Sequence, residues 1–309
     1  MGSLALRRGF SFGKGTYRLR GTYGNPVRVA FDLLSCVGFI CTCDVKSLSI
    51  HGTAFILEHD GMIYLVTAKH VSEGLADCPH LVRFNNRDGT SCAFHIDSEN
   101  DGSNSIWFSH VESSVDIAVL PFPYDVTIQG VVAVALRSGA TVKRSADTIG
   151  EVGCRDMCHA IGLFSQHAGK ERNVAVVHTG HIAAMFSSKE LIDVLRKDKN
   201  VELEGYLVEI SNLKGLSGAP VFVRQGLELI VPIGDEGGTS IVTTYTPDLK
   251  LLGVWSGSWD KPLTHTGDRI PVGMGIVTPA SRLLELLDSI PVAENRWYWK
   301  RCINAASED

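Results

Sequence analysis

The sequence lacks long hydrophobic runs. No apolar run approaches the roughly 20 residues that a membrane-spanning helix needs, and the longest candidate, Cys36–Cys43 (CVGFICTC), has the length of a strand. An excess of charge is missing too, because the net charge is −5 and the isoelectric point is near 6.1. This balance gives no overall electrostatic reason to expect nucleic-acid binding. We therefore expect an ordinary globular protein without a membrane span.

Acidic residues are missing from the first 31 positions, where the basic residues are Arg7, Arg8, Lys14, Arg18, Arg20 and Arg28. A transit peptide or a twin-arginine signal is not indicated, because no apolar segment follows the arginines and glycine and proline interrupt any amphipathic helix. We expect residues 1–35 to form a basic N-terminal extension of a cytoplasmic protein. Contact of this extension with nucleic acid, a membrane surface or a partner protein stays open.

A convincing metal-binding pattern is missing as well. Cys154-x-x-x-Cys158-His159 and Cys41-x-Cys43 each lack a second pair at zinc spacing. The acidic loop at residues 97–104 starts like a calcium loop, but Phe108 stands where the bidentate glutamate should be. We expect no metal or other cofactor. The eight cysteines are expected to be reduced and mostly buried, since the chain has no secretion signal and is too long to need disulfides.

Short apolar runs and 31 glycines favour a strand-rich chain. In the first half, strands are expected at residues 36–43, 47–58, 62–68, 81–84, 91–96 and 105–110. A further apolar run at 130–136 and a polar connector at 137–152 separate these from strands expected at 158–164, 174–184, 204–210, 221–223, 249–256 and 273–277. Two short helices are expected. One is at Ser187–Lys197, where Ser187 and Glu190 have the spacing of a capping box, and the other is at 279–290.

The segment Asn212–Phe222 (NLKGLSGAPVF) places a serine between two glycines. Such a turn can hold the Ser217 hydroxyl away from the backbone. It can also aim the amide N–H groups of Gly215 and Ser217 at one point, which is what an oxyanion requires. By itself the motif is equally consistent with an ordinary turn.

Two other residues, His70 and Asp116, could act together with Ser217. His70 ends an expected strand, and Asp116 directly precedes the apolar residues 117–120, where a carboxylate is costly to bury without hydrogen bonds. The order histidine, aspartate, serine is one of the known triad orders. In that chemistry His70 takes the Ser217 proton, and Asp116 holds the imidazole and stabilises the imidazolium.

Four local motifs resemble those of chymotrypsin-like (trypsin-like) serine peptidases. They are Gly52-Thr53-Ala54-Phe55, Thr67-Ala68-Lys69-His70-Val71, Asp116-Ile117-Ala118-Val119-Leu120 and Gly215-Leu216-Ser217-Gly218-Ala219-Pro220. The resemblance covers about residues 36–290. It implies an all-β fold of two packed antiparallel Greek-key barrels, at about 36–136 and 153–278, then a short helix at 279–290 and a tail at 291–309. It also implies that His70 and Asp116 come from the first barrel and Ser217 from the second, with Gly215 and Ser217 as the oxyanion hole.

The chain departs from the family pattern at several positions. Leu216 replaces the usual Asp or Asn before the serine, so we expect activity without an activation that uses this side chain. Val71 stands where secreted members have cysteine. By the resemblance, Ser211, Ser256, Gly257 and Gly275 line a neutral specificity pocket that Met274 narrows. Without an acidic residue at Ser211, Arg/Lys preference is not expected, and small to medium apolar P1 residues are.

The sequence thus favours a serine endopeptidase that acts on a protein or peptide substrate. Two alternatives remain: a catalytically silent member of the fold that binds peptides or serves as a scaffold, and an acyl hydrolase of the esterase type that uses the same site. The oligomeric state and the physiological substrate are not predicted.

Overall fold

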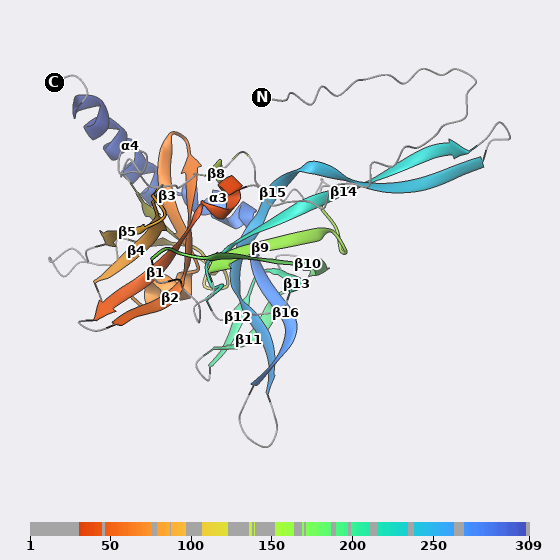
Figure 1. Cartoon of the computed structure of the whole chain (residues 1–309), viewed down its shortest axis with the longest axis horizontal. Helices are drawn as coiled ribbons and strands as arrows, with labels where there is room; N and C mark the ends of the chain where they lie inside the picture. The colour runs from red at the N-terminus through yellow and green to blue at the C-terminus, as the bar shows by residue number, and fades with distance from the viewer. Residues whose placement is uncertain are drawn as a thin grey trace.

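The computed structural model describes residues 31–44, 47–75, 79–86, 88–96, 107–122, 136–137, 139, 152–163, 169, 171–186, 190–196, 199–210, 215–233, 238–262 and 269–306. Antiparallel strands dominate and form two bodies packed against each other (Figure 1). The protein is thus mostly β, as the sequence predicts. No described helix is long and apolar enough to cross a membrane.

The first body is a sheet with the strand order β5-β4-β1-β2-β3-β7-β6, in which β8 also pairs with β2. Its strands are β1 (Val37–Asp44), β2 (Ser47–His59), β3 (Met62–Thr67), β4 (His80–Asn85), β5 (Ser91–Ile96), β6 (Phe108–Ser109), β7 (Ala118–Pro121) and β8 (Leu136–Arg137), and the helix α1 (Phe31–Leu34) precedes them. Successive side chains point to opposite faces, so Phe55 joins one buried cluster while its neighbours Ala54 and Ile56 join another. Both faces of the sheet are therefore buried.

The second body is a closed six-stranded barrel with the order β10-β13-β16-β15-β14-β9. Its strands are β9 (Met157–Leu163), β10 (Ala175–Met185), β13 (Tyr206–Glu209), β14 (Pro220–Ile233), β15 (Gly238–Pro262) and β16 (Arg269–Pro279). Trp255 is the largest side chain of the barrel interior and is almost fully buried. β14 and β15 continue past the barrel as a long two-stranded ribbon (Figure 1).

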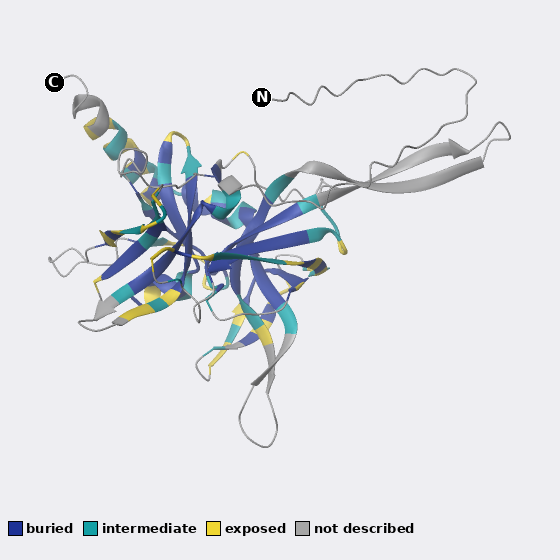
Figure 2. Ribbon diagram, viewed as in Figure 1, coloured by how far each residue is buried: buried dark blue, intermediate teal, exposed yellow. Residues whose placement is uncertain are grey.

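The two bodies share a hydrophobic core. One cluster joins Phe55 and Val66 of the first body to Ile161 and Phe222 of the second, and it also includes buried leucines of the helix α3 (Ala280–Leu287). In Figure 2 the buried residues accordingly fill both bodies where they face each other. A shared core of this kind fixes the two bodies in one relative position, which is what a site at their junction requires.

Two parts of the sequence prediction need correction. The helix expected at Ser187–Lys197 is wrong, because β11 (Ile192–Arg196) pairs with β12 (Lys199–Leu203) as a hairpin. Ile192 and Val194 alternate into a buried cluster with Leu203, so the two-residue period prevails over the capping-box signal. The tail expected at 291–309 instead carries the helix α4 (Ile290–Ala306).

Other expectations have mixed outcomes. The described end strands of the first body, β5 and β6, are not paired with each other, so closure into a barrel is seen in the second body. The domain boundaries stay predictions. Cys36, Cys41 and Cys158 are buried and free, Cys92 is partly buried, and Cys154 and Cys302 are free but exposed, so burial holds for only part of the set.

Candidate active site

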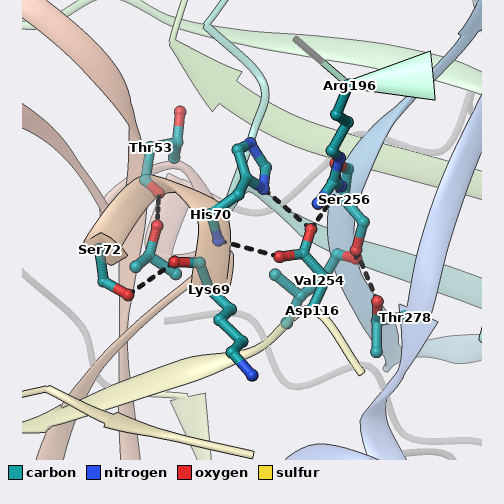
Figure 3. Close-up of polar contacts among 10 residues, drawn as sticks. Thr53, Lys69, His70, Ser72, Asp116, Arg196, Val254, Ser256 and Thr278 are labelled. Carbon is teal, nitrogen blue, oxygen red and sulfur yellow. Dashed lines mark hydrogen bonds and ion pairs between the residues drawn. The ribbon is translucent and has the colours of Figure 1, made fainter. Parts of the chain in front are cut away.

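Strand pairing brings His70 and Asp116 together. β3 pairs with β7 so that Thr67, the last residue of β3, lies opposite Ala118, the first residue of β7. His70 follows Thr67 by three residues, and Asp116 precedes Ala118 by two. His70 belongs to the short helix α2 (Lys69–Glu73), which starts after β3 ends. Its backbone N–H donates to Asp116 Oδ1 at 3.0 Å, and its ring Nδ1 lies 2.9 Å from Asp116 Oδ2 (Figure 3).

This geometry selects one state of the imidazole ring. An ionised carboxylate only accepts hydrogen bonds, so Nδ1 carries the proton that it shares with Asp116. In the neutral ring Nε2 is then the basic nitrogen. Among the described residues, no partner is hydrogen-bonded to Nε2 of His70. Within the described ranges, no hydrogen bond therefore competes for the lone pair of Nε2.

Asp116 is buried and ionised. Only 3% of its side chain is exposed, and a third hydrogen bond comes from Arg196 Nη2, 2.6 Å from Oδ2. Burial by itself would raise the pKa of the carboxyl group. The hydrogen bond and charge of His70, together with the guanidinium of Arg196, outweigh burial and hold the pKa of Asp116 well below its ordinary value.

The sequence analysis did not identify Arg196. The residue lies in the segment predicted to be a helix, where its position relative to Asp116 could not be inferred. The alternation of Ile192, Val194 and Arg196 was the available signal, since in a strand these side chains share one face. Besides Asp116, Nη2 of Arg196 also contacts the backbone carbonyl of Ser256 at 2.5 Å (Figure 3).

The turn at residues 215–219, which we call the serine turn, is hydrogen-bonded to β2 of the first body. The backbone N–H of Thr53 donates to the carbonyl of Ser217 at 2.8 Å, and the Thr53 hydroxyl donates to the carbonyl of Gly215 at 2.7 Å. On the barrel side, the N–H of Gly218 donates to the carbonyl of Trp255. Ser217 thus lies at the junction of the two bodies, held from both sides.

Gly218 lets the turn approach the segment that carries His70. Its φ of 85° favours glycine, and an added Cβ would lie 2.1 Å from the Thr53 carbonyl and 3.1 Å from the Ala68 nitrogen. Ala68 immediately precedes α2. The serine turn therefore lies close to the residue that precedes the histidine helix.

Among the described residues, the Ser217 hydroxyl has no hydrogen-bond partner. In the described part of the chain, no hydrogen bond joins it to His70 Nε2, and no protein acceptor is bonded to the amide of Gly215 or of Ser217. Catalytic hydrogen bonds are often long before substrate binds. The role of the two amides as an oxyanion hole stays a prediction.

The residues expected to form the specificity pocket are only partly described. Ser211 lies outside the described residues. The Ser256 hydroxyl is buried and pairs with the hydroxyl of Thr278 at 2.5 Å, whereas an added Cβ on Gly275 would meet the ring of Trp255. Gly257 lies near Arg196, because an added Cβ would be 3.8 Å from Nη2. The pocket assignment stays a prediction, and Arg196 adds a positive charge beside it.

Within the described ranges, no group of three or more His, Cys, Asp or Glu side chains could hold a metal ion. Burial raises the pKa of Cys158 to about 12, so this thiol stays protonated and is a poor ligand and nucleophile at neutral pH. The Asp97–Asn104 loop lies outside the described residues.

The structure of this chain is similar to solved structures, but its sequence matches no protein-family model and no curated protein. A thermostable serine protease, AL20, from an extremophilic microorganism matches with 10% identity, a TM-score of 0.45, and coverage of 82% of this chain and 94% of its own. A protein named HBP matches with 12% identity, a TM-score of 0.47, and coverage of 85% and 94%. At these values neither match assigns an activity. The chain is similar in structure to chymotrypsin-like serine protease folds at low sequence identity.

Proposed function

We propose that the protein is a serine endopeptidase with His70, Asp116 and Ser217 as its catalytic triad. The hydrogen bonds from both the backbone and the ring of His70 to the buried Asp116 carboxylate carry this proposal. An ion pair that served only stability would not need a histidine whose second ring nitrogen has no hydrogen-bond partner among the described residues. The geometry supports a general base rather than a structural histidine.

The reaction follows from the roles of these groups. Ser217 Oγ attacks the peptide carbonyl carbon while its proton passes to Nε2 of His70. The carbonyl oxygen becomes an oxyanion, to which the amides of Gly215 and Ser217 donate. The peptide C–N bond then breaks, the imidazolium returns its proton to the leaving amine, and an acyl group remains on Ser217. Water attacks this ester by the same steps in reverse order and releases the acid.

The substrate class is proposed from the pocket residues. Ser211, Ser256, Gly257 and Gly275 carry no negative charge, so we propose small to medium apolar P1 residues and no trypsin-like preference for Arg or Lys. The nearby guanidinium of Arg196 also disfavours a cationic side chain.

One observation favours a second function, a silent module that binds peptides without cleaving them. Arg196 forms an ion pair with the same oxygen of Asp116 that accepts from His70, and a paired carboxylate stabilises an imidazolium less than a free one. On this account the fold keeps the residues of the triad but holds them in an unproductive arrangement.

Cleavage of a peptide library separates these functions. We expect the wild-type protein to cleave after small or medium apolar residues, and Ser217→Ala to lose cleavage while its thermal unfolding midpoint stays the same. Peptide binding without cleavage by the wild type would favour the silent module. Turnover of small esters without any peptide cleavage would instead favour the esterase alternative.

A further inference from the structure

One nitrogen of Arg196 bridges two groups of the candidate site. Nη2 lies 2.6 Å from Asp116 Oδ2 and 2.5 Å from the carbonyl oxygen of Ser256, so both of its hydrogens are used. Asp116 belongs to the first body and Ser256 to β15 of the barrel. Figure 3 shows the guanidinium lying between them.

The position of Arg196 is set by its strand. Ile192 and Val194 of β11 are buried in a small cluster with Leu203, Leu207 and Ile276, which fastens the hairpin to the barrel. Side chains two residues apart in a strand share a face, so Arg196 leaves the hairpin on the side of the barrel. The contact is therefore built into the hairpin and is not a chance conformation of a surface arginine; its side chain is only 21% exposed.

The carbonyl of Ser256 lies at an edge of β15 beside the serine turn. β15 pairs with β14 as far as Val254 opposite Pro220, and the N–H and carbonyl of Trp255 then bond to Ala219 and Gly218 of the turn. β15 also pairs with β16. In that pairing Trp255 lies opposite Val277 and Gly257 lies opposite Ile276, so Ser256 has no partner residue in β16. After the Trp255 carbonyl, which is bonded to the serine turn, the Ser256 carbonyl is thus the next acceptor along β15.

An extended peptide with its scissile carbonyl at Ser217 would continue the pairing of this edge, because added strands bind through main-chain hydrogen bonds. Its N–H groups would need the Ser256 carbonyl. Arg196 already bonds to this oxygen, and its guanidinium also occupies the space over Gly257. A peptide and the arginine therefore compete for one place.

We propose that Arg196 closes the peptide-binding edge of β15 and that a peptide substrate displaces its guanidinium from Ser256. This inference rests on the proposed peptidase function. Displacement leaves Asp116 with its two hydrogen bonds from His70, so the buried carboxylate stays partnered. A hydrogen bond from a charged group is among the stronger ones in proteins, so the competition weakens peptide binding roughly 10- to 100-fold.

The test compares Arg196→Met, which keeps an apolar stem without donors, with the matched control Lys199→Met. Lys199 lies opposite Arg196 in the hairpin and is exposed, so its replacement removes a neighbouring positive charge but keeps the Arg196 contacts to Asp116 and Ser256. Thermal unfolding checks that both variants fold. Two probes are used: a small alkyl fluorophosphonate, which does not need the β15 edge, and a tetrapeptidyl diphenyl phosphonate ending in a valine analogue, which does.

The measured quantity is the ratio of the labelling rate constants at Ser217 for the peptidyl and the small probe. We expect Arg196→Met to raise this ratio roughly tenfold and Lys199→Met to leave it unchanged. If both rate constants change by the same factor, the ratio is unchanged and Arg196 acts through Asp116. If neither rate constant changes, or if the ratio falls, there is no competition. Either result overturns the proposal.

A binding measurement separates this inference from the proposed function. The affinity of the same tetrapeptide as its C-terminal amide is measured for Ser217→Ala and for Ser217→Ala combined with Arg196→Met. Tighter binding to the double variant supports the proposal even if the wild-type protein never labels, in which case only the peptidase function fails. Equal affinity contradicts the proposal.

Discussion

The imidazole of His70 and the carboxylate of Asp116 are joined twice, through ring Nδ1 at 2.9 Å and through the histidine backbone N–H at 3.0 Å. The backbone bond fixes the position of the carboxylate relative to the main chain, and the ring bond then fixes the imidazole. His70 lies just after β3 and Asp116 just before β7, so the pairing of these two strands brings the residues together.

Asp116→Asn is expected to reduce kcat by roughly 10⁴-fold, because an amide can donate to Nδ1 and favours the wrong tautomer of His70. Peptide hydrolysis by purified wild type and variant measures this effect. KM should change little, since Asp116 does not contact the substrate. A loss in kcat of less than tenfold would mean that Asp116 does not orient the base.

Ionisation of Asp116 should also make stability depend on pH. Its pKa is lowered in the folded protein, so its ionised form stabilises the fold above its ordinary pKa of about 4. This contribution is lost as the pH falls from about 4 toward the lower folded value. Urea unfolding of wild type and Asp116→Asn from pH 7 to pH 3 measures the difference in unfolding free energy. We expect that difference to shrink below about pH 4, and a constant difference would contradict the assignment.

Gly218→Ala is expected to lower the free energy of unfolding by at least about 2 kcal/mol, since a Cβ is strained at this φ and collides with the Thr53 carbonyl. Gly273→Ala is the matched control. Gly273 has a similar φ of 77°, but no atom lies within 4 Å of an added Cβ. Denaturant unfolding should show a cost of about 1–2 kcal/mol for the control, from strain alone. Equal costs would mean that the close approach of the turn to β2 contributes nothing.

Thr53→Val tests how the first body supports the proposed oxyanion hole. The hydroxyl of Thr53 donates to the Gly215 carbonyl and accepts from the N–H of Leu163 at 3.3 Å, and valine keeps the shape without either bond. We expect a stability loss of about 1–3 kcal/mol. We also expect kcat to fall by tenfold or more, up to the roughly 100- to 1,000-fold loss of an oxyanion donor. If kcat is unchanged while stability falls, Thr53 supports the fold but not the site.

Much of the fold could be predicted from the local sequence. Runs rich in branched and aromatic residues predicted most described strands, because such residues suit a pleated and buried surface. Asp60 and Gly61, which both have positive φ, form the short turn between β2 and β3. The motifs around His70, Asp116 and Ser217 indicated the candidate site, and the catalytic roles of these residues stay a prediction.

What the sequence did not predict depends on contacts between distant segments. The contact of Arg196 with Asp116 spans 80 residues, so the alternation in β11 could place Arg196 on one face of the strand but not beside Asp116. The hairpin of β11 and β12 was missed because the spacing of Ser187 and Glu190 favours a helix, whereas burial of Ile192 against Ile276 favours a strand. α4 was missed although Pro291 lies at its first turn, where proline is favoured.

The central claim is that Ser217 is a nucleophile activated by His70. It is tested most directly by labelling the wild type, Ser217→Ala and His70→Ala with an alkyl fluorophosphonate and locating the adduct by mass spectrometry. We expect one adduct on Ser217 in the wild type, none on Ser217→Ala, and labelling of His70→Ala slowed by several orders of magnitude. An adduct elsewhere, or none on a folded wild-type protein, would contradict the claim.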